Sequence, residues 1–316
     1  MNEKKSATQI KGALLLLFTA FIWGISFVSQ SVGMESVDAF TFIGIRTLLG
    51  AVTLLPVILI SDLVKFHKIK FDVKALKYGV IIGVILCIAT NLQQFAFYYS
   101  TAGKIAFITA SYMFFIPIVG IFLKKKIHII TWLCVLLAFV GLYFLCFPSI
   151  KTAISTGEFS MNKGDFLTLI CAVFFTAQIL LIEKFGQSCD GIKMSFVQFL
   201  TAGLISFVLM WIFETPKWSS IKEAGIPILY AGILSCGMGY TLQIIGQKYC
   251  EATLASLLMS MESVFAVLAS AILIHERLTG REIAGCSIMF SAILISQISD
   301  MIIARKKSRI SDYNAQ

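Results

Sequence analysis

Charged residues, histidine and proline are all scarce in this chain. Asp, Glu, Lys and Arg make up only 14% of its 316 residues, whereas soluble domains carry about 25%. The three histidines form no H-E-x-x-H motif, and neither G-x-S-x-G nor a P-loop occurs, which argues against metalloprotease, serine-hydrolase and ATPase chemistry. The eight cysteines include no C-x-x-C pair and lie mostly in apolar runs, as small hydrophobic side chains do. We therefore expect neither an enzyme nor a bound cofactor or metal.

Long apolar runs occupy most of the sequence instead. Hydrophobic residues make up 58% of the chain, and its mean hydropathy is +0.88, whereas soluble domains are about 45–50% apolar. Most runs approach the ~20 residues that a helix needs to cross a bilayer. We expect an all-α integral membrane protein in the lipid bilayer, with ten transmembrane helices near residues 12–32, 38–60, 75–99, 102–123, 129–147, 165–183, 193–213, 224–249, 252–274 and 282–303.

The basic residues gather in the segments between these runs. The formal net charge of +9 would suggest nucleic-acid binding in a soluble protein, but cytoplasmic loops of membrane proteins also favour Lys and Arg. With both termini inside, about 18 Lys and Arg fall on the cytoplasmic side and about 7 on the other. We therefore expect a multi-pass protein of the cell (plasma) membrane with both termini cytoplasmic, and no nucleic-acid partner.

Two segments of the chain follow one pattern. Residues 102–126 and 252–279 each begin after a polar turn, run through an apolar helix and end in a charged turn. Tyr112 in the first segment has the same position as Glu262 in the second, about 150 residues later. Such internal repeats are typical of many transporters. Five spans per half is odd, so the second half enters the bilayer inverted. We expect two inverted five-helix repeats, residues 12–147 and 165–303, around a central cavity. A cytoplasmic N-terminal segment (1–11), a connecting loop (148–164) and a cytoplasmic tail (304–316) complete the chain.

Two charged residues lie inside predicted spans. A carboxylate at the position of Glu262, near mid-span, costs roughly 2.5–3.5 kcal/mol on insertion and usually faces a partner or a watery cavity. Glu262 could bind an ammonium group, could take up and release a proton, or could be structural and bonded to Arg46 or to backbone. Arg46 in turn could be a counter-charge for Glu262, an anchor for a substrate carboxylate, or a side chain that snorkels to the headgroups.

Uncharged polar residues form stripes on several predicted spans. A polar stripe in an apolar helix needs a hydrogen-bond partner or water, and matching stripes in the third and eighth spans favour a shared cavity. Trp23, Gln178 and Gln198 mark the first, sixth and seventh spans. The predicted substrate-binding set is Trp23, Ser26, Arg46, Asn91, Gln94, Tyr98, Tyr112, Gln178, Gln198, Gln243 and Glu262.

Three motifs resemble EamA-type members of the drug/metabolite transporter superfamily. FITASYMFFIPIVGIFLKK is similar to the fourth helix of that family, SLLMSMESVFAVLASAILIHERLTGREIAG to its ninth helix and the following turn, and WGISF to its first-helix motif. The resemblance implies transport, in the export direction. The family usually has proline after the ninth-helix glutamate, where this chain has Ser263, so we expect a weaker kink there.

The leading hypothesis is a secondary transporter that exports small metabolites, such as amino acids, by alternating access between the two repeats. One alternative is multidrug or quaternary-ammonium efflux. Another is a membrane sensor or scaffold without net transport. Coupling to a proton or another ion stays open, and the sequence defines neither the substrate nor the oligomeric state.

Overall fold

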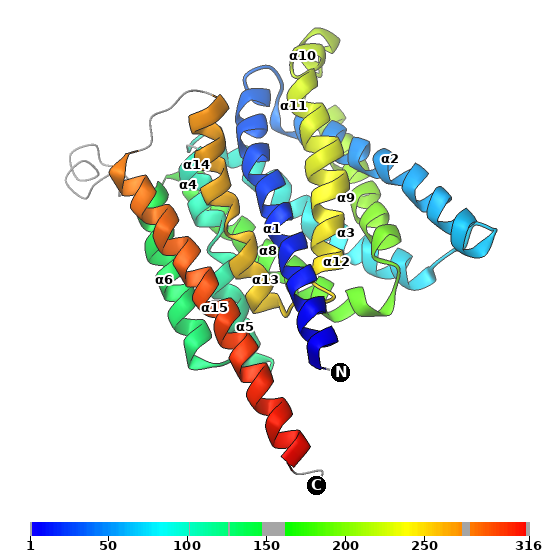
Figure 1. Cartoon of the computed structure of the whole chain (residues 1–316). Coiled ribbons are helices and arrows are strands. Elements are labelled where there is room, and N and C mark those ends of the chain that lie inside the picture. The colour runs from blue at the N-terminus through cyan, green and yellow to red at the C-terminus, as the bar shows by residue number, and fades with distance from the viewer. Residues whose placement is uncertain (1, 101, 126, 147–161, 274–278, 314–316) are drawn as a thin grey trace.

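The described part of the chain is almost entirely helical. The structure, a computed structural model, describes residues 2–100, 102–125, 127–146, 162–273 and 279–313, and no β-strand occurs among them (Figure 1). The helices of the first half are α1 (Asn2–Gly33), α2 (Ala39–Phe66), α3 (Val73–Ala96), α4 (Ala102–Thr109), α5 (Tyr112–Phe122) and α6 (Ile129–Cys146). Those of the second are α8 (Lys163–Phe185), α9 (Gly191–Phe213), α10 (Trp218–Glu223), α11 (Gly225–Leu229), α12 (Thr241–Gly246), α13 (Ala252–Met259), α14 (Glu262–Leu273) and α15 (Gly280–Tyr313).

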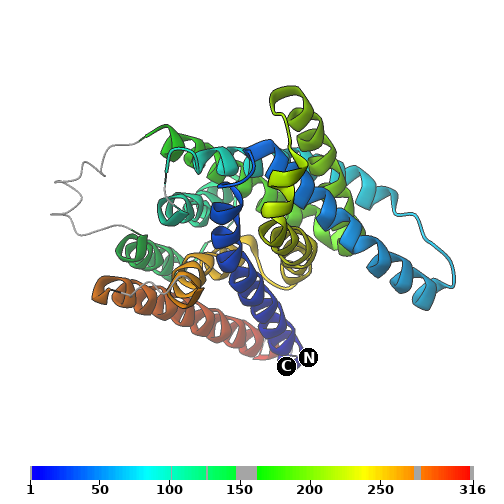
Figure 2. The ribbon, with the colours of Figure 1, turned by 90° about the horizontal axis from the view of Figure 1, so that it is seen from above.

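Eight helical segments of the described chain are long and apolar enough to cross a membrane, and a shorter apolar helix spans Ile129–Phe144. The chain is therefore a multi-pass membrane protein. The other two of the ten predicted spans coincide with α6 and α15, which pack along each other on one flank of the bundle, opposite the outer ends of α2 and α3 (Figure 2). The prediction of ten crossings stays a prediction.

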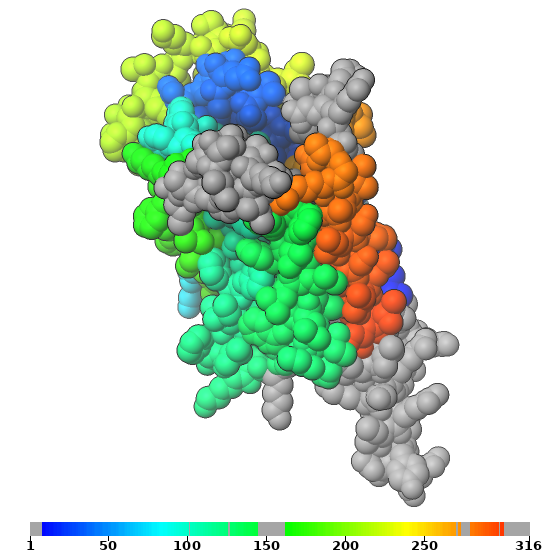
Figure 3. Space-filling model, turned by 90° about the vertical axis from the view of Figure 1, so that its left-hand side faces the viewer, coloured from blue at the N-terminus to red at the C-terminus, as the bar shows by residue number. Residues whose placement is uncertain are grey.

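The outer face of α6 and α15 is apolar. Leu133, Leu136 and Val140 on α6 are more than 45% exposed, and Phe290 and Leu294 on α15 are similarly exposed. The two helices form one continuous face of the molecule (Figure 3). Because scattered apolar side chains on this face have no protein cover, they suit contact with lipid tails.

The two halves interlock through close helix contacts. α2 and α3 both pack against α9, and α1 packs against α14. A Cβ added to Gly24 of α1 would lie 2.5 Å from Phe265 Cβ and 2.8 Å from the carbonyl oxygen of Glu262. A Cβ added to Gly83 of α3 would lie 2.7 Å from the carbonyl oxygen of Gln198. Small residues therefore bring helices of opposite halves together, as is common between membrane helices.

Two helices are interrupted at equivalent places. α4 and α13 are each 8 residues long, and each is followed by a two-residue turn before α5 or α14 begins. Backbone hydrogen bonds between residues three positions apart close these turns, from Met113 N to Ala110 O at 3.0 Å and from Ser263 N to Ser260 O at 3.2 Å. Such three-residue bonds tighten and end a helix. The expected weaker kink is therefore not observed, since the second helix breaks directly before Glu262 without a proline.

A third irregular segment precedes α12. Residues Tyr230–Tyr240 form an eleven-residue π-helix, η2, that continues directly into α12. π-helices are rare, and most occur as single turns at functional sites. Gly232, Gly237 and Gly239 lie within η2, and Gly232 packs against Leu49 and the Arg46 carbonyl oxygen of α2. This segment carries Ser235 and Tyr240, which both face the cavity described next.

Candidate functional site

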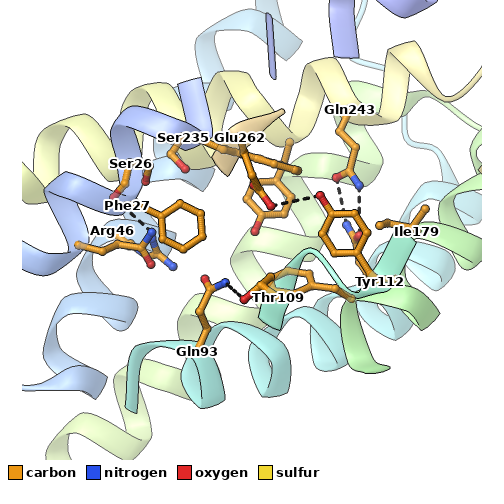
Figure 4. Close-up of a pocket in the computed structure, with 15 residues that line it drawn as sticks. Ser26, Phe27, Arg46, Gln93, Thr109, Tyr112, Ile179, Ser235, Gln243 and Glu262 are labelled. Atoms are coloured by element: carbon orange, nitrogen blue, oxygen red, sulfur yellow. Dashed lines mark hydrogen bonds between the residues drawn. The ribbon is translucent and has the colours of Figure 1, made fainter. Parts of the chain in front are cut away.

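A cavity of about 30 Å³ lies beside the two helix breaks (Figure 4). Both halves of the chain build its wall, through α1 to α5 on one side and α8, η2, α12 and α14 on the other. A cavity needs about 10–15 Å³ to hold a water molecule, so this one accommodates one or two waters but no metabolite. The lining residues are Trp23, Ser26, Phe27, Gln30, Arg46, Gln93, Thr109, Tyr112, Phe175, Gln178, Ile179, Ser235, Tyr240, Gln243 and Glu262.

Glu262 and Tyr112 meet in this cavity. The Tyr112 hydroxyl donates to Glu262 Oε1 at 3.1 Å, and both side chains are buried, with exposed fractions of 3% for Tyr112 and 4% for Glu262 (Figure 4). Each is the first residue of its helix, α5 or α14. A helix N-terminus stabilises a negative charge placed in its first turn. The fold therefore gives the Glu262 carboxylate both a hydroxyl donor and a favourable helix end.

Arg46 lies in the same wall but pairs with no carboxylate of the described residues. Its side chain is buried, its guanidinium carbon lies 5.5 Å from the Phe42 ring centroid, and none of the salt bridges among the described residues joins it to Glu262. One of the three alternatives for Arg46, a direct ion pair with Glu262, is therefore not found among the described residues: Arg46 lies over Phe42, whereas the Glu262 carboxylate is turned toward Tyr112. The snorkelling alternative also does not fit, since Arg46 is only 4% exposed.

Amide side chains line another part of the cavity. Gln178 and Gln243 exchange two hydrogen bonds of 3.2 Å between α8 and α12. Gln93 Nε2 donates to Thr109 Oγ1 at 3.1 Å, which joins α3 to α4. Gln93 was absent from the predicted set, although it lies at the position of Gln243 under the same repeat offset. The repeat comparison, applied to every polar residue, would have identified it.

Several polar atoms in the wall have no protein partner among the described residues. They are Trp23 Nε1, Ser26 Oγ, Gln30 Oε1 and Arg46 Nε, all buried and all on α1 or α2. Buried polar atoms nearly always have a hydrogen-bond partner, whether protein or water. The α1–α2 side of the cavity therefore offers unused hydrogen-bonding groups to water or to a ligand.

Seven of the eleven predicted site residues line the cavity, and four do not. Asn91 Nδ2 donates to Ser206 Oγ at 2.8 Å and thereby joins α3 to α9. Gln94 and Gln198 are fully buried, and their amide groups have no partner among the described residues. Substrate contact by these residues stays a prediction without support from the cavity lining.

Tyr98 lies at the end of the bundle rather than in the cavity. Its hydroxyl donates to Asp38 Oδ1 at 3.0 Å and accepts from Ala39 N at 3.1 Å, so it connects the end of α3 to the start of α2. Burial, which outweighs the lowering effect of the Ala39 N–H, raises the pKa of Tyr98 to about 12. The phenol therefore stays protonated and continues to donate to Asp38.

These observations define a helical membrane protein with a buried polar site between two halves of its chain. The EamA-like transporter family matches this chain twice, at residues 10–147 and 162–297, and the chain belongs to that family. It is therefore a membrane transporter. The first matched region runs from within α1 through α6 and the second from α8 into α15, so the family domain is duplicated.

The chain is also similar to individual proteins along most of its length. An uncharacterized transporter of Archaeoglobus fulgidus is 27% identical over 89% of this chain and 83% of its own. The corresponding values are 23%, 92% and 94% for an uncharacterized transporter of Clostridium kluyveri, and 20%, 91% and 97% for the uncharacterized transporter YoaV of Bacillus subtilis. A solved crystal structure matches with a TM-score of 0.72 at 14% identity, over 90% of this chain and 97% of that chain. This last similarity concerns the fold alone.

Proposed function

We propose that this membrane transporter is a secondary exporter of small metabolites such as amino acids. The observation that carries the proposal is the cavity, which both halves of the chain line and which is too small for a metabolite. A transporter that alternates between two open states passes through a state in which its site is closed. The small cavity between the two halves fits such a state, in which the substrate site is contracted.

Alternating access would use the two interrupted helices. In transporters built from inverted repeats, broken helices contribute binding groups near the bilayer midplane. Tyr112 and Glu262 occupy such positions, one in each half. The two matches of the family domain support two related repeats. In this proposal ten spans form two inverted five-helix repeats that rock against each other around the cavity.

The direction and location of transport rest on other arguments. Export is inferred from the sequence resemblance to EamA-type transporters. The excess of Lys and Arg in alternate loops supports cytoplasmic termini, and the proposed location is the plasma membrane. Coupling to a proton or another ion is part of the same proposal, with Glu262 as the carboxylate that would carry the charge.

Quaternary-ammonium efflux is the second candidate, and one feature favours it. The Trp23 and Tyr240 rings, with centroids 4.5 Å apart, line the cavity together with the Glu262 carboxylate, and aromatic faces attract cations. Arg46 in the same wall argues against a substrate that carries positive charge alone. A sensor without net transport would bind a ligand in this cavity but never move it.

Counterflow in proteoliposomes tests these alternatives. Vesicles loaded with unlabelled amino acids, amines or quaternary ammonium compounds would be given the matching labelled compound. We expect exchange of amino acids by the wild type and a loss of at least tenfold in Glu262→Gln. Glu282→Gln is the matched control, because Glu282 does not line the cavity and caps the start of α15 through Thr279. Exchange of quaternary ammonium compounds alone would favour the second candidate, and ligand binding without any exchange would contradict transport.

A further inference from the structure

Arg46 and Glu262 place two opposite charges in the wall of one small cavity without pairing them. Both side chains are 4% exposed, and both line the cavity. In Figure 4, Arg46 and Ser26 lie together at one end, while Glu262 is turned toward Tyr112. Opposite charges attract strongly inside a protein. Because Arg46 and Glu262 do not pair with each other, each of the two charges requires another interaction partner.

We propose that the transporter recognises zwitterions, with Arg46 and Ser26 binding the carboxylate of the substrate and Glu262 binding its ammonium group. This inference rests on the proposed function, because it assumes that the substrate occupies this site when the contracted cavity widens. It adds that two charges on one molecule are required and assigns each of them to an end of the site.

The end at Arg46 is built for an anion. Arg46 Nε and Ser26 Oγ are both buried and have no protein partner among the described residues. Ser26 itself is 1% exposed. The planar guanidinium group matches a carboxylate with two parallel hydrogen bonds, and the contact with the Phe42 ring holds it in the wall. A hydroxyl donor beside a free guanidinium edge fits a carboxylate better than it fits a neutral group.

The end at Glu262 is built for a cation. Tyr112 donates to Glu262 Oε1, and no described residue donates to Oε2. The rings of Trp23 and Tyr240 line the cavity beside it. An ammonium group can donate to the carboxylate while it contacts these aromatic faces. A compound with one charge would satisfy one end and leave the other charge buried and unpaired, which is costly.

The test compares compounds that differ only in their charged groups. Thermal stabilisation of the detergent-solubilised wild type would be titrated with L-leucine and L-phenylalanine, with leucinamide and phenylalaninamide, and with isocaproate and hydrocinnamate. δ-Aminovalerate would add a zwitterion with more widely separated charges. A ligand raises the melting temperature according to its affinity for the folded state. We expect half-saturating concentrations at least tenfold higher for the amides and the acids than for the best zwitterion. Equal binding by an amide or an acid, or no stabilisation by any zwitterion, would overturn the inference.

Variants assign the two ends. Arg46→Gln should remove the preference for an amino acid over its amide, and Glu262→Gln should remove the preference for an amino acid over its deaminated acid. Arg281→Gln is the matched control, since the Arg281 guanidinium lies over the Tyr143 and Phe144 rings of α6, away from the cavity. If a cavity variant does not fold, the ligand series on the wild type still decides the question. Zwitterion binding without exchange in vesicles would contradict transport alone, and rapid exchange of singly charged compounds would contradict zwitterion recognition alone.

Discussion

The hydroxyl of Tyr112 donates to the carboxylate of Glu262 at 3.1 Å, across 150 positions of sequence. Each residue begins the helix that follows a break, in α5 and in α14. The hydrogen bond therefore joins the two equivalent breaks of a duplicated family domain. A movement of one broken helix relative to the other must stretch this bond or carry both residues together.

Tyr112→Phe should destabilise the protein by ~1–3 kcal/mol, because a buried carboxylate loses its donor. The measurement is thermal unfolding in detergent. Tyr249→Phe is the control, since Tyr249 is 38% exposed and does not line the cavity. If the two variants melt at the same temperature, the hydrogen bond contributes nothing to stability.

Gly24→Ala should force α1 away from α14. The new Cβ would lie 2.5 Å from Phe265 Cβ and 2.8 Å from the Glu262 carbonyl oxygen, and such overpacking costs ~1–3 kcal/mol. Gly103→Ala is the control, because an added Cβ there meets nothing within 4 Å. Wild-type stability and exchange in Gly24→Ala would show that the two helices separate easily.

Asp165→Asn should cost more stability than Glu183→Gln. Asp165 lies at the start of α8 and pairs with Lys104 at 2.6 Å, and its side chain is 1% exposed. Removal of one partner from a buried pair costs ~3–5 kcal/mol, and we expect about 2–3 kcal/mol because Lys104 keeps 18% exposure. Glu183 pairs with Lys125 at the other end of α8 and is 21% exposed, so its loss should cost under ~1 kcal/mol. Equal melting temperatures of the two variants would contradict this ranking.

Asn91→Ala and Ser206→Ala should be coupled in stability but silent in substrate binding. The two side chains share a hydrogen bond of 2.8 Å between α3 and α9, and such bonds in membrane proteins couple by ~0.6 kcal/mol, with a maximum of about 1.7. A double-mutant cycle of unfolding free energies measures the coupling. If either substitution changes the half-saturating concentration of an exchanged compound, Asn91 would instead belong to the substrate-binding site.

Sequence pattern predicted the parts of this site that follow from repeats and from a single helix face. The equivalence of Tyr112 and Glu262 came from the repeated segments, and Trp23 and Ser26 came from one face of the first span. Asn91 was placed in the site although it packs on α9, and Gln93 was missed although it lines the cavity. Polar residues of α3 point to more than one side, and only tertiary packing decides which side meets the cavity.

The number of crossings stays a prediction of the apolar runs. They predicted ten spans, and eight segments of the described chain are long and apolar enough to cross a membrane. The helix breaks were also hard to predict, because α13 ends without proline and its turn closes through backbone hydrogen bonds. Composition identifies apolar length, but it carries little information about where a helix changes its hydrogen-bonding pattern.

The π-helix η2 sets the rotation about the helix axis at which α12 begins. A π-turn closes its hydrogen bond one residue later than an α-turn, so Tyr230–Tyr240 winds through fewer turns than the same residues would in an α-helix. α12 begins from that rotation, and Gln243 of α12 and Gln247, which directly follows it, then reach Gln178 and the Ile179 carbonyl oxygen on α8. The contacts of these two amides are thus encoded upstream, and one residue added to or removed from η2 would turn both away from α8 without any change in their own sequence.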